Sequence, residues 1–238
     1  MSNFQFTRPS NFPPVVKNLI IINVLVFVAQ LTLDNQFHIT EKLMLYPVMF
    51  PQFKPYQLFT HLFAHSPAML FHIVFNMFGL WMFGKILENV WGAKRFLFFY
   101  LACGLGAAAL HILMQYVRYN QIEELWRAAV TAGDTIAVQS YINELSSELG
   151  PALGASGAVM GIFIAFGYLF PNTELFLMFI PVPIKAKWLM IGLVAIDLFG
   201  GVARVSGDNI AHFAHLGGAI TGFIIVFIWN KTNRKTLY

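Results

Sequence analysis

Long apolar runs separated by short polar stretches dominate the pattern along the chain. A membrane-spanning helix requires about 20 mainly apolar residues, and six runs reach or approach that length. They lie near residues 17–33, 67–86, 95–116, 156–170, 186–203 and 210–230. The pattern therefore predicts an all-α, polytopic membrane protein, a bundle of six transmembrane helices that forms one domain over residues 1–238.

The fourth run is the shortest, because it begins at Ser156 and a Pro171-Asn172 pair interrupts it. Lipid offers no hydrogen-bond partner to the bare backbone groups at a helix end. A short helix within the membrane must therefore begin against protein or water. The pattern predicts a water-accessible cavity beside Ser156.

Residues 117–151 form a long stretch of soluble character. Within it, apolar residues recur at helical spacing over 122–129 and again over 136–149. This spacing predicts one or two amphipathic helices, with a break near residues 133–134, where a Gly-Asp pair stands. We expect the segment to be an extended loop on the outer side that caps the site or contacts substrate.

The composition supports a membrane protein. Hydrophobic residues make up 58% of the chain and charged residues 11%, whereas soluble domains carry about 25% charged residues. If the N-terminus is cytoplasmic, ten of the 15 Lys and Arg side chains lie on the inner side. That asymmetry predicts that both termini are cytoplasmic. Because the positive charges follow this membrane orientation, the net charge of +4 is not a sign of nucleic-acid binding.

The N-terminal residues 1–14 are polar and aromatic, and no small-residue cleavage site follows the first apolar run. We therefore expect no signal peptide. A bare six-helix chain without a transit peptide favours a bacterial inner membrane as its location. The lone Cys103 excludes internal disulfides and cysteine-rich metal sites.

The first cluster with chemical potential is Gly154-Ala155-Ser156-Gly157, at the start of the fourth run. A serine flanked by glycines has an exposed hydroxyl and an approachable backbone N–H. Those are the requirements of a nucleophile with an oxyanion donor beside it. The alternative is a packing role, because serine and glycine are common where membrane helices approach closely.

The second cluster begins the last run, with His212 and His215. His215 shares a helix face with Gly218 and Gly222, and the fourth run has small residues of its own. Two such faces allow close backbone approach, which would bring the His215 ring within reach of Ser156 as a general base. The alternatives are a histidine that is hydrogen-bonded inside the bundle, or His212 as the base.

The third cluster lies around the second run. His72 and Asn76 are spaced i, i+4, so they share a helix face and can both donate to an oxyanion, together with the Ser156 N–H. The alternative is a zinc site in which His61 and His65 join the two histidines of the last run. The chain has no His-Glu-x-x-His motif, and we expect neither a metal nor another cofactor.

These clusters together resemble motifs of the rhomboid intramembrane proteases over about residues 40–230. Gly-Ala-Ser-Gly is similar to the family's Gly-x-Ser-Gly motif, and His72-x-x-x-Asn76 is similar to its oxyanion pair. His215 with Gly218 and Gly222 resembles the family's Ala-His-x-x-Gly-x-x-x-Gly helix. A further resemblance is to the turn after the second helix, carried by Glu88, Gly92, Lys94 and Phe96.

The resemblance implies a serine endopeptidase that hydrolyses peptide bonds in or near transmembrane segments through a Ser-His dyad. Ser156 would be the nucleophile and His215 the base, and His72 and Asn76 would stabilise the oxyanion. The partners would be transmembrane protein substrates, entering between the second and fifth helices, and the lipid bilayer. Since the family's dyad has no carboxylate, we assign Asp197 no catalytic role.

Two of the chain's departures from the family pattern are substitutions, and a third is a longer loop between His65 and His72. Tyr56-Gln57 stands where many bacterial members carry Trp-Arg, and Met160 stands where many place an aromatic ring on the catalytic histidine. Two other functions compete with the protease. One is a catalytically silent relative that binds client proteins, and the other is a small transporter with histidines as ligands.

Overall fold

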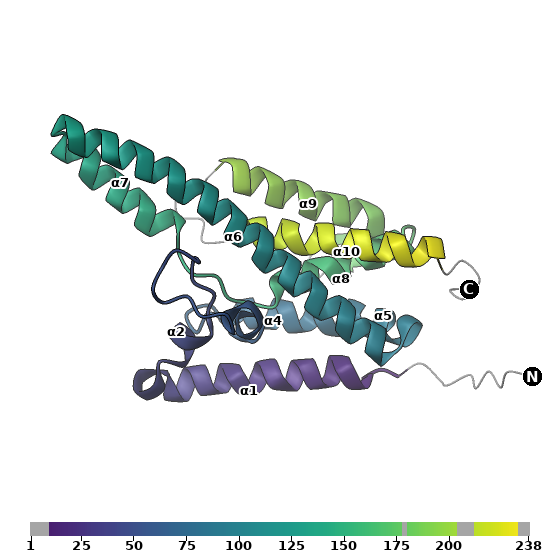
Figure 1. Ribbon diagram of the computed structural model, residues 1–238. Coiled ribbons are helices and arrows are strands. Elements are labelled where there is room, and N and C mark those ends of the chain that lie inside the picture. The colour runs from purple at the N-terminus through teal and green to yellow at the C-terminus, as the bar shows by residue number, and fades with distance from the viewer. Residues whose placement is uncertain (1–9, 178–179, 204–211, 233–238) are drawn as a thin grey trace, which may run out of the picture.

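Three helices form the centre of the structure (Figure 1). They are α6 (Ala93–Ala132), α8 (Ser156–Leu169) and α10 (His212–Thr232), and α10 packs against both of the others. The computed structural model describes residues 10–177, 180–203 and 212–232. Helix α9 (Ala186–Ala203) packs on α8 and α10. Helix α1 (Pro14–Phe37) contacts α6 and the segment that follows α4 (Leu70–Gly79).

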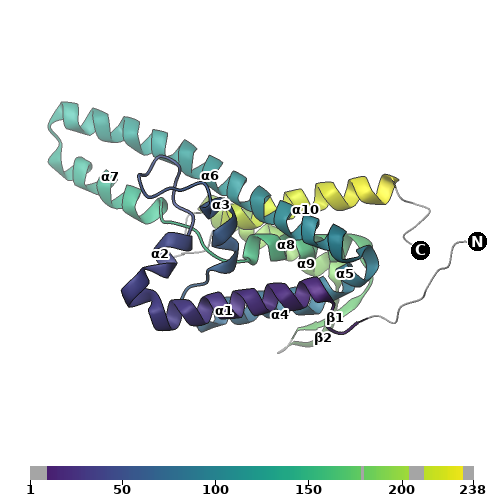
Figure 2. The ribbon, with the colours of Figure 1, turned by 60° about the horizontal axis from the view of Figure 1, so that its bottom comes forward.

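Shorter elements connect these helices (Figure 2). They are α2 (Ile39–Leu43), α3 (Gln57–Thr60), the 3-10 turn η1 (His61–Phe63), the π-helical turn η2 (Leu80–Gly84), α5 (Lys85–Trp91), α7 (Thr135–Glu148), and strands β1 (Glu174–Leu177) and β2 (Ile180–Lys185). Because η2 follows α4 without a break, α4, η2 and α5 form one apolar helical segment over Leu70–Trp91.

Glycines bring α8 and α10 into backbone contact. A β-carbon placed on Gly222 would lie 2.7 Å from the Gly161 Cα, and one placed on Gly218 would collide with the Gly157 carbonyl oxygen. On its other side α10 approaches α6, where a β-carbon on Gly217 would lie 2.8 Å from the Leu110 Cβ. Small residues are the usual means of close helix approach within a membrane. The start of α10 is thereby held against the start of α8.

A buried carboxylate joins α5 to the start of α1. The two Glu88 oxygens accept hydrogen bonds from the Val15 and Val16 N–H groups, at 2.9 and 2.8 Å. The first N–H groups of a helix have no partner within it, and they favour a negative charge. Gly92 then turns the chain into α6 with a φ of 80°, a conformation that L side chains rarely adopt. The turn that resembles the family motif therefore has a structural role.

The helix-rich fold agrees with the prediction, with two differences. Among the described residues, four helical segments are long and apolar enough to cross a membrane, and α8 is a shorter apolar helix. The count of six transmembrane helices therefore stays a prediction. The described residues are mostly helical, as predicted, and the antiparallel pair β1–β2 between α8 and α9 is an addition to the helical fold. Residues 174–185 are apolar at nearly every position and do not alternate with polar residues, so the sequence gives no separate strand signal.

The 117–151 segment forms two helices with the predicted break at Gly133, but the first of them is continuous with α6. Helix α6 continues unbroken from its apolar part to Ala132, turns at Gly133 with a φ of 71°, and returns as α7. The Asp134 side chain caps α7 by accepting from the Ala137 N–H at 2.9 Å. Arg118 and Glu144 pair across the hairpin. The hairpin projects from the end of the bundle opposite the start of α1 and the end of α10 (Figures 1 and 2).

Candidate active site

Ser156 is the first residue of α8, and the chain that leads into it is fixed by backbone pairing. Leu45 and Ala152 exchange two hydrogen bonds of 2.8 and 2.9 Å, and Gly154 donates to the His61 carbonyl at 2.9 Å. Gly154 has a φ of 125°, which favours glycine. Because Ser156 lies in the first turn of α8, its backbone N–H has no acceptor within the helix and is available as a donor.

His72 on α4 approaches the same point. A β-carbon on Gly154 would lie 2.7 Å from the His72 Nε2 and 3.6 Å from the Ser156 Oγ. The His72 Nδ1 accepts a hydrogen bond from the Ser66 N–H at 3.4 Å. In a neutral ring Nε2 then carries the hydrogen. His72 therefore presents an N–H donor towards the Ser156 side of Gly154.

Asn76 lies one turn further along α4 and is buried. Its side-chain amide donates to the His72 carbonyl at 2.7 Å, which fixes the side chain against its own helix. The second amide hydrogen can still be donated elsewhere. The predicted i, i+4 pair therefore forms on one face of α4, and α4 contacts α8.

The two histidines of α10 differ in what surrounds them. His212 packs on α9, since a β-carbon on Gly200 would lie 2.8 Å from the His212 Cδ2. His215 interacts electrostatically with His72 on α4 and with His111 on α6, both of which are near Ser156. The preceding Ala214 carbonyl would lie 3.3 Å from a β-carbon on Gly157. The surroundings therefore favour His215 over His212 as the partner of Ser156.

A small cavity adjoins Ser156. Its lining includes the polar side chains of His61, His111 and Ser156, and it extends to Ala214 on α10. The His111 Nε2 is buried and has no hydrogen-bond partner among the described residues. The sequence analysis did not identify His111, although a lone histidine within the apolar run 95–116 is a signal that could have found it.

His61 and His65 support this site from the loop before α4. The His61 Nδ1 lies 2.7 Å from the Gln57 carbonyl oxygen, and the His65 Nε2 accepts from the Ala155 N–H at 3.5 Å. Burial, together with the nearby His72, lowers the pKa of His65 to about 3. The His65 ring therefore holds the backbone before Ser156, whereas the His61 ring is held against its own helical turn and contributes its backbone carbonyl as acceptor for Gly154.

The zinc alternative gains no support from this geometry. Over the three described ranges, no three His, Cys, Asp or Glu side chains converge in a metal-binding arrangement.

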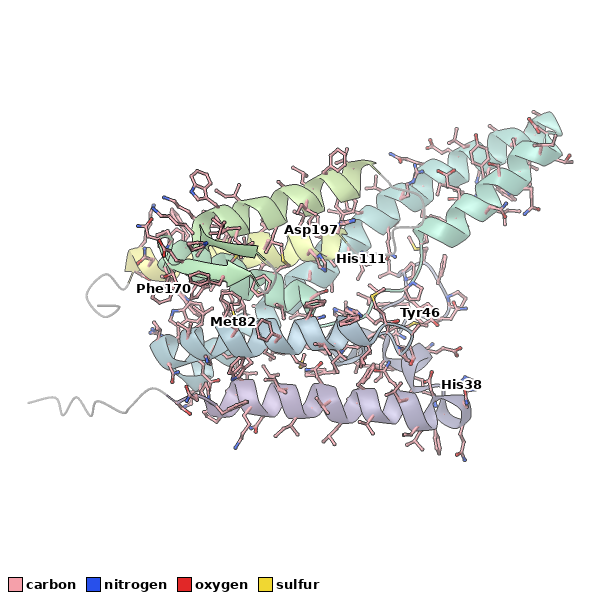
Figure 3. All side chains as sticks on the ribbon, turned by 180° about the vertical axis from the view of Figure 1, so that it is seen from behind. His38, Tyr46, Met82, His111, Phe170 and Asp197 are labelled. Carbon is pink, nitrogen blue, oxygen red and sulfur yellow. The ribbon has the colours of Figure 1, made fainter. Side chains whose placement is uncertain are left out.

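Asp197 was predicted to have no catalytic role, but its position beside the histidines of α10 is distinctive. It lies on α9 and is 6% exposed. Its Oδ1 lies 2.9 Å from the Nδ1 of His212 and 2.9 Å from the Nδ1 of His215. Figure 3 shows Asp197 and His111 labelled at the same end of the bundle, on two different helices. The signal available in the sequence was an aspartate within an apolar run.

These features define a class, a helical membrane protein whose bundle encloses a serine at a helix start, several histidines and one aspartate. Comparison with known proteins identifies the family within this class. The Rhomboid domain matches residues 52–232, and the chain belongs to the rhomboid family.

Curated relatives come from distant eukaryotes. Over 212 residues the chain is 31% identical to RHOMBOID-like protein 12, mitochondrial, of Arabidopsis thaliana, covering 88% of this chain and 56% of that protein. Over 172 residues it is 28% identical to Rhomboid protein 1, mitochondrial, of Saccharomyces cerevisiae, covering 72% and 42%. Over 175 residues it is 28% identical to the human Presenilin-associated rhomboid-like protein, mitochondrial, covering 71% and 38%. The chain thus spans roughly half or less of each relative's length.

These relatives correct the predicted location. The sequence favoured a bacterial inner membrane, but the relatives above are mitochondrial rhomboid proteins. The prediction of a bacterial membrane is therefore wrong. The reason is that the residues before the first apolar run do not identify which membrane a helical bundle occupies.

Proposed function

We propose that the chain is an intramembrane serine endopeptidase that hydrolyses peptide bonds in or near transmembrane segments of other proteins. Rhomboid family members are generally intramembrane serine proteases. The observation that carries the proposal for this chain is the convergence of Ser156, His72 and His215 from α8, α4 and α10 on one small region. The mitochondrial relatives make a mitochondrial membrane the proposed location.

The proposed reaction begins at Ser156. Its Oγ attacks the carbonyl carbon of the scissile peptide, and the His215 Nε2 takes the hydroxyl proton. A new C–O bond forms, and the carbonyl oxygen becomes an oxyanion. The proposed donors to that charge are the His72 Nε2–H, the Asn76 amide and the Ser156 N–H, and the hydrogen bonds that leave Nε2–H and one amide hydrogen free support this role.

The second half of the reaction returns the enzyme to its starting state. The C–N bond breaks as the protonated His215 gives its proton to the leaving amine. Water then attacks the acyl-enzyme with His215 again acting as base, and the carboxylic acid product leaves Ser156. The cavity that adjoins Ser156 provides a polar place for this water near His61 and His111.

The substrate is proposed to enter sideways from the lipid, between α4 and α9. Both helices present large apolar side chains on their outer faces, such as Phe71 and Phe75 on α4 and Phe199 on α9. A helical substrate hides its carbonyl groups in hydrogen bonds. Segments with helix-weakening residues near the cut site should therefore be preferred, because they unwind at lower cost.

The test is cleavage of a purified single-span substrate by the protein in detergent. We expect cleavage that survives a metal chelator and disappears in Ser156→Ala. Cleavage that persists in Ser156→Ala would contradict the proposed nucleophile. If neither protein cleaves but the native chain retains the substrate on an affinity column, the client-binding function replaces the protease.

A further inference from the structure

Asp197 occupies a position that needs an explanation. A carboxylate within an apolar helix is costly unless partners compensate for its lost hydration. Asp197 meets this need through a single oxygen, Oδ1, which lies 2.9 Å from each of the two Nδ1 atoms of His212 and His215. An ionised carboxylate can only accept hydrogen bonds, so both Nδ1 atoms must carry hydrogens.

The two bonds are not equivalent in their surroundings. His212 is buried, and its ring fills the space left by the missing side chain of Gly200 on α9, close to Asp197. The side chain of His215 is more exposed than that of His212, at 19% against 9%, and it interacts with His72 and His111. His212 therefore anchors the carboxylate to α10, while His215 lies between the carboxylate and the Ser156 region.

We propose that Asp197 is a positioning residue for His215, so that the chain uses a Ser–His–Asp arrangement in place of the expected dyad. This inference rests on the proposed protease function. Accepting the Nδ1 hydrogen fixes the tautomer of His215 and leaves Nε2 with a lone pair that can take the Ser156 proton. When His215 becomes an imidazolium, the negative Asp197 stabilises its charge without itself taking the proton.

Several groups set the charge around His215. Asp197 faces it from α9, His72 from α4 and His111 from α6, and His212 shares its helix and its carboxylate. The three histidines carry no charge when neutral, so Asp197 is the anionic member of this set. Replacing Asp197 with Asn keeps the volume but removes the charge. The Asn amide can also donate to Nδ1 and reverse the tautomer.

The experiment compares the native chain with Asp197→Asn on the cleavage assay over a range of pH, with Leu198→Ala as the control. Leu198 is exposed on the same helix. We expect Asp197→Asn to lower kcat by about 10²- to 10⁴-fold with little change in KM. The pH profile of the variant should differ from that of the native chain, because the negative charge beside the His215 ring has been removed. Leu198→Ala should behave as the native chain does.

Two outcomes distinguish a failure of the proposed protease function from a failure of the positioning role. If the native chain shows no Ser156-dependent cleavage, the proposed function itself fails. If it cleaves and Asp197→Asn matches it in kcat and pH profile, the positioning role is overturned.

A second measurement decides the case if Asp197→Asn does not fold. Histidine ¹⁵N NMR of Ser156→Ala, with the His215 signals assigned by their loss in His215→Gln, reports which ring nitrogen carries the hydrogen. A protonated Nδ1 supports the proposal, and a protonated Nε2 in the neutral ring contradicts it.

Discussion

The two sides of α10 hold this helix by opposite means. Towards α8 the contact consists of glycine backbones, with no room for a β-carbon at Gly218 or Gly222. Towards α9 it includes the hydrogen bonds from His212 and His215 to Asp197. The first side sets how near His215 can come to Ser156, and the second sets how its ring is oriented. His215, the proposed base, therefore depends on both the contact with α8 and the contact with α9.

The largest effect should come from the glycine side. Gly218→Val would drive two methyl groups into the Gly157 backbone and push α10 away from α8. Overpacking of this kind costs about 1–3 kcal/mol or more, and a displacement of about 1 Å at a catalytic group costs on the order of 10²-fold in rate. We expect near-complete loss of cleavage together with a lower melting temperature.

The matched control for this variant is Gly192→Ala on α9, where a β-carbon meets nothing within 4 Å. It should leave both cleavage and melting temperature close to native. Full activity in Gly218→Val would contradict the close approach of α8 and α10.

Asn76→Ala tests the donor opposite the proposed base. If Asn76 donates to the oxyanion, its loss should lower kcat by about 10²- to 10³-fold while substrate binding changes little. The variant also removes a hydrogen bond to the His72 carbonyl, so its melting temperature must be compared with the native value. An unchanged kcat would remove Asn76 from the proposed oxyanion site.

His212→Gln should have a smaller effect on rate than Asp197→Asn. It weakens the anchor of the Asp197 carboxylate but leaves the bond between Asp197 and His215. We expect a loss of about tenfold, within the range for a residue that acts through another hydrogen-bonded group. Steady-state kinetics of His212→Gln and Asp197→Asn measure which variant loses more of its kcat. A larger loss in His212→Gln than in His215→Ala would reverse the assignment of the base.

The smallest effect concerns His65 and pH. Its pKa is lowered by burial from 6.5 to about 3, so the unfolded chain binds a proton that the folded chain excludes. The part of the free energy of unfolding that depends on neutral His65 is fully present above pH 6.5 and is lost as pH falls from 6.5 towards about 3. In this window the loss is about 1.4 kcal/mol per pH unit. Thermal unfolding of His65→Gln should show a shallower pH dependence than the native chain, and equal slopes would contradict this.

The sequence predicts the structure best where residues close together in the chain determine a feature. The start of a helix at Ser156, the small residues facing each other on α8 and α10, and the pairing of His72 with Asn76 on one face of α4 all follow from spacing along single helices. The turn at Gly133 likewise follows from a glycine followed by a capping aspartate. Each of these needs only a short stretch of chain.

The features that sequence could not supply depend on packing between distant segments. Asp197 is 18 residues from His215 along the chain, and only the docking of α9 on α10 brings them together. His111 joins the cavity only because α6 crosses beside Ser156. The continuity of α6 past the expected end of its span was hidden by the change from apolar to polar residues, since either composition can form a helix.

The most direct test of the central claim is covalent labelling of Ser156 by a serine-reactive fluorophosphonate, followed by mass spectrometry of the adduct. The account predicts labelling at Ser156 in the native chain and, more slowly, in His212→Gln, and no labelling above the Ser156→Ala background in His215→Ala. Labelling of His215→Ala at the native rate would show that His215 does not activate Ser156 and would contradict the account.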